Sequence, residues 1–197
     1  GSTVELFSGS DSLGTVIAAD NGTFSITSSE LDDANYTLTV MATDEAGNTS
    51  SPSIGLPITI DTTAPAAPVI STTTSLTNIN TPTIEGTAEV GSTVELFNGS
   101  DSLGTVVAAD DGSFSITPTL GDSDYVLTVT ATDEAGNTSV PSAGLNITVD
   151  TTAPVTPVIT TDIALTKINT PTIEGTAEAG STVELFSGSD SLGTVIA

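Results

Sequence analysis

The residues that could do chemistry in this 197-residue chain are almost all oxygen acids. The chain has 25 aspartates and glutamates, a single basic residue, Lys167, and no histidine or cysteine. It therefore lacks the usual general base near neutral pH, a thiolate nucleophile, and the usual zinc and haem ligands. Carboxylate, asparagine and backbone oxygens remain as metal ligands, and these suit calcium or magnesium.

Adjacent carboxylates could also serve as the acid and base of a glycosidase. Asp32 and Asp33 are such a pair, but no basic residue lies near them. We therefore predict that the chain has no active site and is not an enzyme.

The charge of the chain excludes two classes of partner. A formal net charge of −24 repels nucleic acid phosphates and anionic membranes, because binding to either needs Lys and Arg to replace counterions. We predict no nucleic acid partner and no membrane insertion in this segment. Because 37% of the residues are apolar, whereas disordered chains are poor in apolar residues, we predict that the chain folds.

The acidic residues recur because the sequence is repeated. The stretch GSTVELF begins at Gly1, Gly91 and Gly180, and DTTAP begins at Asp61 and Asp150, which gives a period of 89 to 90 residues. Taking DTTAP as the linker, we predict a partial repeat at residues 1–61, a complete repeat at 62–150 and a partial repeat at 151–197. The first would hold the last five strands of a repeat, and the third would hold the first four.

The hydrophobic pattern within one repeat alternates with a period of two, which is typical of half-buried strands. In residues 124–132, Tyr125, Leu127, Val129 and Ala131 fall on one face. Turn-forming segments rich in Gly, Asp, Asn and Ser separate these runs, and no stretch has a helical period. The sequence predicts an all-β fold of tandem antiparallel β-sandwiches of immunoglobulin type, with about seven strands per repeat. The predicted strands lie near residues 66–72, 82–88, 93–98, 102–109, 113–117, 124–132 and 144–149.

One tyrosine in each of the first two copies suggests how a loop is held. Tyr125, and Tyr36 in the first copy, stand where such sandwiches often have a tyrosine corner, with the hydroxyl bonded to backbone upstream. We predict that role for both. Neither copy has the disulfide or core tryptophan of antibody domains, so Val, Ile, Leu, Phe and Ala must form the core.

The motifs TIEGTAE, GSTVELF, DDGSFSIT, YVLTVTATDEAGNTS and DTTAP resemble the bacterial Ig-like repeats of giant surface adhesins, including biofilm-associated proteins and RTX adhesins. The resemblance covers the whole chain, although the chain has no glycine-rich RTX nonapeptide. It implies a long stalk of tandem sandwiches outside the bacterial cell that holds a ligand-binding tip, commonly stiffened by calcium at the domain junctions.

The strand order places the acidic loops at two poles of each sandwich. The loops after 82–88, 102–109 and 124–132 lie at the pole where the chain enters, and those after 93–98 and 113–117 lie where it leaves. Each linker is thus expected to lie between acidic loops of two repeats, which also include Asp11, Asp32, Asp33 and Glu89. The predicted calcium ligands are Asp61 and Asp150 in the linkers, Asp133, Glu134 and Asn137 in DEAGN, Asp44 in its first copy, and Asp101, Asp110, Asp111, Asp122 and Asp124 in other loops.

Calcium is the expected counterion because carboxylates that converge with almost no Lys or Arg cannot be balanced by ion pairs, and calcium takes six to eight oxygens. The alternative is that DDG and DEAGN are ordinary β-turns, in which Asp, Asn and Gly are favoured for local backbone reasons. We favour turns for Asp110 and Asp111, and metal for Asp61 and Asp150. The two interpretations are balanced for Asp133, Glu134 and Asn137.

These inferences favour a structural extender segment of a secreted bacterial surface adhesin, located outside the cell, whose partners are the neighbouring repeats. One alternative is a module that itself binds glycan or a host surface, although aromatic residues form only 4% of the chain. Another is an Ig-like accessory module of a surface enzyme. If the 197-residue chain is isolated, the front of one molecule could complete the back of another, giving head-to-tail self-association by strand complementation. Because residues 1–18 are identical to residues 180–197 and would compete in such a joint, we favour a segment of a longer array.

Overall fold

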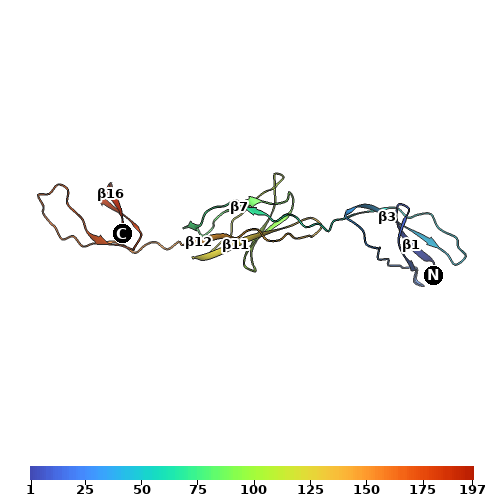
Figure 1. Cartoon of the computed structure of the whole chain (residues 1–197). Coiled ribbons are helices and arrows are strands. Elements are labelled where there is room, and N and C mark those ends of the chain that lie inside the picture. Colours follow the sequence, from blue (N-terminus) through green and yellow to red (C-terminus); the bar gives the residue numbers. More distant parts are fainter.

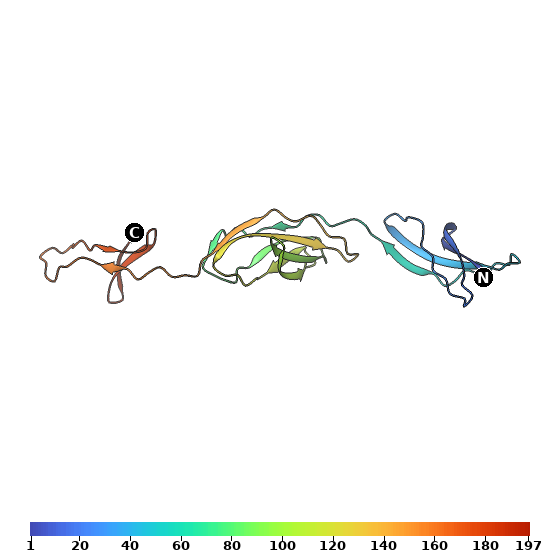
Figure 2. The same cartoon turned by 90° about the horizontal axis from the view of Figure 1, so that it is seen from below.

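The computed structural model describes residues 1–197 as three β-rich bodies arranged in a line (Figures 1 and 2). The two termini lie in the outer bodies, and the complete repeat lies between them. All elements are strands. Since the structure has no helix, it has none with the length and apolar character needed to cross a bilayer.

The middle body is a sandwich of two sheets. The fold class predicted from the sequence is confirmed, including the positions of the second to seventh strands to within two residues. The smaller sheet has the order β10 (Ser113–Ile116), β7 (Ile84–Thr87), β5 (Val69–Ile70), and the larger has the order β6 (Leu76–Thr77), β12 (Leu145–Val149), β11 (Ser123–Thr132), β8 (Thr93–Asn98), β9 (Asp101–Val107).

The core lies between these two sheets and follows the alternation of the sequence. Leu127, Val129 and Ala131 of β11 are fully buried, whereas Val126, which points to the other face, is 54% exposed. Phe114 and Ile116 from the facing sheet close the other side. Because every second residue of a strand points to the same face, the predicted inward set is the observed core.

The structure differs from the sequence-based prediction at the first strand. Within the predicted strand at 66–72 only β5 forms, and it pairs with β7 in the smaller sheet. A second short strand, β6, follows outside the predicted range and pairs with β12 in the larger sheet. The β6–β12 pair is parallel, so the sandwich is not wholly antiparallel. The predicted strand at 102–109 is β9, which forms a hairpin with β8 in the larger sheet.

The first body is a single sheet of order β2 (Asp11–Ile17), β1 (Thr3–Ser8), β3 (Ala34–Thr43), β4 (Leu56–Ile60). Residues 23–26, which correspond to β10, form no strand there. In the middle body β10 pairs only with β7, and the first body has no counterpart of β7. The strand expected at this position in residues 1–61 is therefore missing because its partner is missing.

The last body holds two separate hairpins, β13 (Val158–Ile159) with β14 (Gly175–Thr176) and β15 (Thr182–Ser187) with β16 (Asp190–Ile196). They correspond in order to the first four strands expected for residues 151–197. No hydrogen-bonded sheet crosses either linker, since every ladder lies within 3–60, 69–149 or 158–196.

The loops of the middle body lie at the predicted poles. The backbone bonds Gly91 N to Ala108 O and Ala88 N to Gly112 O, of 3.1 and 2.9 Å, join the turn after β7 to the turn after β9. The end of β11 lies beside the start of β8, so the loop after β11 shares this pole. The chain enters at this pole and leaves at the other, where β12 ends.

Candidate functional site at the linker junctions

The first linker is held by an aspartate from the loop between β2 and β3. The Asp33 carboxylate accepts hydrogen bonds from the Thr62 amide at 2.9 Å, the Thr62 hydroxyl at 2.8 Å and the Thr63 hydroxyl at 2.7 Å. The linker's own Asp61 accepts from the Thr63 amide at 3.0 Å. Three donors from two consecutive residues thus fix the linker against the end of the first body.

The second linker repeats this arrangement. Asp122, from the loop between β10 and β11, accepts from the Thr151 amide at 3.0 Å, the Thr151 hydroxyl at 2.8 Å and the Thr152 hydroxyl at 2.8 Å. Asp150 accepts from the Thr152 amide at 3.0 Å, as Asp61 does at the first linker. The loops differ in length by one residue, so the conserved geometry comes from the linker and the loop aspartate.

These hydrogen bonds lower the pKa of both loop aspartates. At Asp33 the bond from the Thr63 hydroxyl contributes most and that from Thr62 follows. At Asp122 the bonds from the Thr151 hydroxyl and amide contribute most. Donors that stabilise a carboxylate favour its charged form. Both aspartates are therefore ionised, acceptor-only groups throughout the neutral range.

The loop after β11, in the following body, also contacts the first linker. Asn137 donates its side-chain amide to the Asp61 carbonyl oxygen at 3.0 Å and to the Asp133 carboxylate at 2.9 Å, and its own amide also donates to Asp133. The bond from the Asn137 side chain is the main cause of the lowered pKa of Asp133. Asp61 thus lies between a loop of the preceding body and a turn of the following one, as the pole assignment predicts.

The first copy of DEAGN makes the same turn without a linker beside it. Asn48 donates its side-chain and backbone amides to Asp44, each at 2.8 Å, and lowers the pKa of that carboxyl. Both residues are exposed, whereas Asp133 and Asn137 are half-buried. The turn therefore forms from local bonds alone, and the linker adds one contact to it.

The other predicted ligands lie in turns or at strand ends. Asp111 accepts from the Ser113 amide at 2.9 Å. The Ser113 side chain contributes most to the lowered pKa of Asp111, and this amide bond follows. Asp124 accepts from the Thr148 hydroxyl across the β11–β12 pair. Asp101 closes the β8–β9 hairpin opposite Asn98. The remaining side chains, Asp110 and Glu134, are exposed and make no hydrogen bond to the rest of the chain.

The predicted calcium ligands do not gather into one cluster of acidic side chains in the structure. No three carboxylates come together in the structure, although calcium needs six to eight oxygens. At the junctions the carboxylate oxygens of Asp33, Asp61 and Asp133 accept bonds from threonine and asparagine donors instead. Calcium binding stays a prediction from the sequence, and the geometry of DDG and DEAGN is that of the turn alternative.

The sequence indicates the acceptors of the junctions but not their donors. Thr62, Thr63, Thr151 and Thr152 carry all the side-chain and backbone donors that bind the loop aspartates. The available signal was the pair of threonines that follows the linker aspartate in both copies of DTTAP. Because threonine is common throughout the chain, such a pair does not stand out in the sequence.

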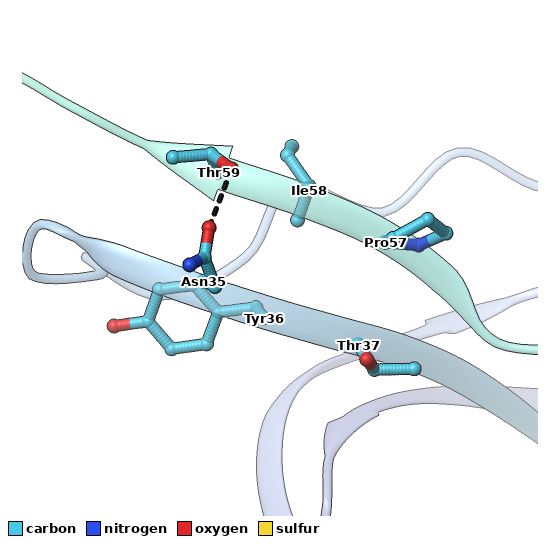
Figure 3. Close-up of a pocket in the computed structure, with 6 residues that line it drawn as sticks. All are labelled: Asn35, Tyr36, Thr37, Pro57, Ile58 and Thr59. Carbon is cyan, nitrogen blue, oxygen red and sulfur yellow. Dashed lines mark hydrogen bonds between the residues drawn. The ribbon is translucent and has the colours of Figure 1, made fainter.

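A hollow of about 280 Å³ lies on the first body, lined by β3 and β4 (Figure 3). Asn35 accepts from the Thr59 hydroxyl at 2.6 Å, with Tyr36 and Ile58 beside them. Ile58 is 38% exposed, whereas its counterpart Ile147 in the complete sandwich is 2% exposed. Ile58 therefore lies on the sheet face that a second sheet covers in the middle body, and the lining of the hollow holds no acid or base.

Comparison with known proteins supports the fold. The profile of a family described as "Bacterial Ig-like domain" matches residues 1–62 and 69–151. Among curated proteins, the chain is 33% identical over 156 residues to Exoglucanase B of Cellulomonas fimi, which covers 66% of this chain and 14% of that protein. It is 35% identical over 91 residues to Bacillopeptidase F of Bacillus subtilis, covering 45% of this chain and 6% of that protein. The chain thus spans a small part of each relative.

Two solved structures are also similar. A BSP domain of a biofilm associated protein has 26% identity and a TM-score of 0.37, over 77% of this chain and 25% of that one. The fibronectin(III)-like modules of Clostridium thermocellum CbhA have 16% identity and a TM-score of 0.49, over 75% of this chain and 77% of theirs. Since the family profile matches well over half of the residues, on a fold of two facing β-sheets, the chain belongs to the bacterial Ig-like domain family.

Proposed function

We propose that this segment is a structural extender: a series of Ig-like units that sets the distance between the parts of a surface-exposed bacterial protein. The observation that carries the proposal is that the chain enters and leaves the complete unit at opposite poles, with bonded linkers at both. Consecutive units then add length in one direction (Figure 2). Family membership supports a location outside the bacterial cell.

The aromatic residues of the complete unit favour spacing over direct adhesion. Phe114 is buried, Phe97 is half-buried, and Tyr125 is half-buried with its hydroxyl bonded to backbone. Sugar-binding platforms usually present exposed aromatic rings, and this unit presents none. Direct binding of glycan or of a host surface remains the alternative that experiment should address.

The extender function predicts a constant increment of length per unit. A chain with a second copy of residues 62–150 inserted after Asp150 should have a maximum dimension about 40 Å greater, because strands rise about 3.3 Å per residue and the linker adds the remainder. Small-angle X-ray scattering of the two chains measures the difference. An unchanged or smaller particle would show that the units fold back on one another, and binding on a glycan array would support the adhesive alternative.

Calcium at the junctions is a separate part of the proposal and needs its own test. Calcium that binds only the native state raises stability by about 1.4–2.7 kcal/mol per site at tenfold to hundredfold excess over the dissociation constant. Thermal unfolding of the full chain in a chelator and in millimolar calcium measures this gain. Equal unfolding temperatures would remove calcium from the proposal and leave the hydrogen bonds of the linkers to hold the junctions.

A further inference from the structure

We propose that the loop aspartate and the two linker threonines form a metal-independent latch at each junction, which sets the direction in which the chain leaves a unit. The latch of the first junction is Asp33 with Thr62 and Thr63, and that of the second is Asp122 with Thr151 and Thr152. This inference rests on the proposed extender function and supplies a mechanism for its directionality.

The geometry of the latch restrains both position and rotation. One carboxylate oxygen accepts the amide and the hydroxyl of the first threonine, and the other oxygen accepts the hydroxyl of the second. Because a carboxylate is planar, two bonded oxygens fix its plane relative to the linker backbone. Threonine suits this role since its branched side chain is stiff about χ1. The distances at the two junctions agree within 0.1 Å.

The tyrosine corner places the latch aspartate. The Tyr36 hydroxyl donates to the carbonyl oxygen of Asp32 at 3.0 Å, and the Tyr125 hydroxyl donates to that of Gly121 at 3.1 Å. In each copy the bonded residue directly precedes the latch aspartate. The corner thus holds the last part of the loop in the same way in both copies, although the first part differs in length by one residue.

The charges around the latch make it independent of ion pairing. The acidic residues closest to Asp33 along the loop and linker are Asp32 and Asp61, and those closest to Asp122 are Asp124 and Asp150. The only basic side chain of the chain, Lys167, lies in neither loop nor linker. The latch is therefore a carboxylate held by neutral donors, and the lowered pKa values of Asp33 and Asp122 accord with it.

Amide hydrogen exchange by NMR on the full 197-residue chain, in a chelating buffer at neutral pH, tests this inference. The Thr62 and Thr151 amides should be protected without calcium. Asp33→Ala should speed exchange at Thr62 by about tenfold, the order expected when a charged acceptor is lost, and should leave Thr151 unchanged. The second junction is then an internal control for folding.

Asp32→Ala is the matched variant. It removes the same charge from the same loop, but the Asp32 contact is through its backbone, so protection at Thr62 should persist. Equal loss of protection in both variants, or protection in the wild-type chain only when calcium is present, would overturn the latch. If protection behaves as expected while the inserted unit adds no length, the latch stands and the extender function is wrong.

Discussion

At the residue scale, aspartate has two structural roles in this chain. Asp44, Asp111 and Asp133 close turns by accepting amide bonds from residues two or four positions ahead. Asp33 and Asp122 reach about thirty positions along the chain to the linkers. In both roles neutral donors stabilise a charged carboxylate, so these carboxylates need no basic residue as a partner.

The lowered pKa values predict a loss of stability in acid. Bonds to the ionised Asp33, Asp122 and Asp133 stabilise the native state fully above the pKa of an unfolded aspartate, about 3.9. That contribution to the free energy of unfolding is lost as the pH falls through the lower pKa of the folded state. Carboxyl chemical shifts followed by NMR titration measure each group. Titration of Asp33 and Asp122 at or above the unfolded value would show that their bonds do not persist in solution.

The tyrosine corner gives a second prediction at this scale. Tyr125→Phe keeps the ring but removes the bonds of the hydroxyl to the Gly121 amide and carbonyl, both of 3.1 Å. We expect the free energy of unfolding to fall by about 0.5–1.5 kcal/mol. Urea unfolding monitored on the full chain checks this value, and no change would mean that water replaces the hydroxyl without cost.

At the scale of the element, the close approach of strands in the smaller sheet has a specific cause. Gly86 of β7 lies between Ile70 of β5 and Phe114 of β10 in the ladder. A Cβ at Gly86 would overlap the Val69 carbonyl oxygen and the Phe114 ring. The absent side chain therefore lets β5 pair with β7 while Phe114 fills the core beneath them.

Gly86→Ala should accordingly destabilise the middle body by about 1–3 kcal/mol, the usual cost of overpacking. Gly121→Ala is the control, because its added Cβ would meet only the Tyr125 hydroxyl at 3.9 Å, an ordinary contact. Thermal unfolding of both variants distinguishes the two sites. Similar unfolding temperatures for the variants would show that β5 is not held closely against β7.

The elements also show which parts of the fold the sequence could predict. The strands at 93–98 and 123–132 were predictable because their alternation is regular and turns bound them on both sides. The first strand was not, since β5 and the strand β6 that follows it are two residues each and are defined by which sheet they join. Pairing partners of short edge strands depend on tertiary contacts, and local pattern carries little of that information.

The candidate site was predictable to the same partial extent. The strand order placed Asp61 beside the loop that holds Asp133 and Asn137, and the structure confirms this placement. Whether a carboxylate takes a metal or a hydroxyl donor depends on distances between loops that no single sequence pattern specifies. For this reason Asp33 was identified as a junction residue, while its threonine donors were not.

At the scale of the whole molecule, the chain is a linear series of units, and strand pairing and core packing occur within each unit. The ladders and the core cluster stay inside the bodies, and the linkers are held by side-chain bonds and by the backbone bond from Asp150 N to Thr77 O. Stability should therefore be close to a sum over units and their junctions. Head-to-tail association of separate chains stays a prediction, which light scattering of the 197-residue chain over a range of concentrations can test.

The parallel pairing of β6 with β12 has a mechanical consequence for such a series. Tension along the line of units pulls the chain at Asp61 and Asp150 in opposite directions. Since β6 and β12 point the same way, this force slides one strand along the other and loads the bonds Thr148 N to Ser75 O and Asp150 N to Thr77 O together, at 2.9 and 3.0 Å. Rupture in shear requires these bonds to break at once, so the unit resists extension most strongly at the strands next to its ends.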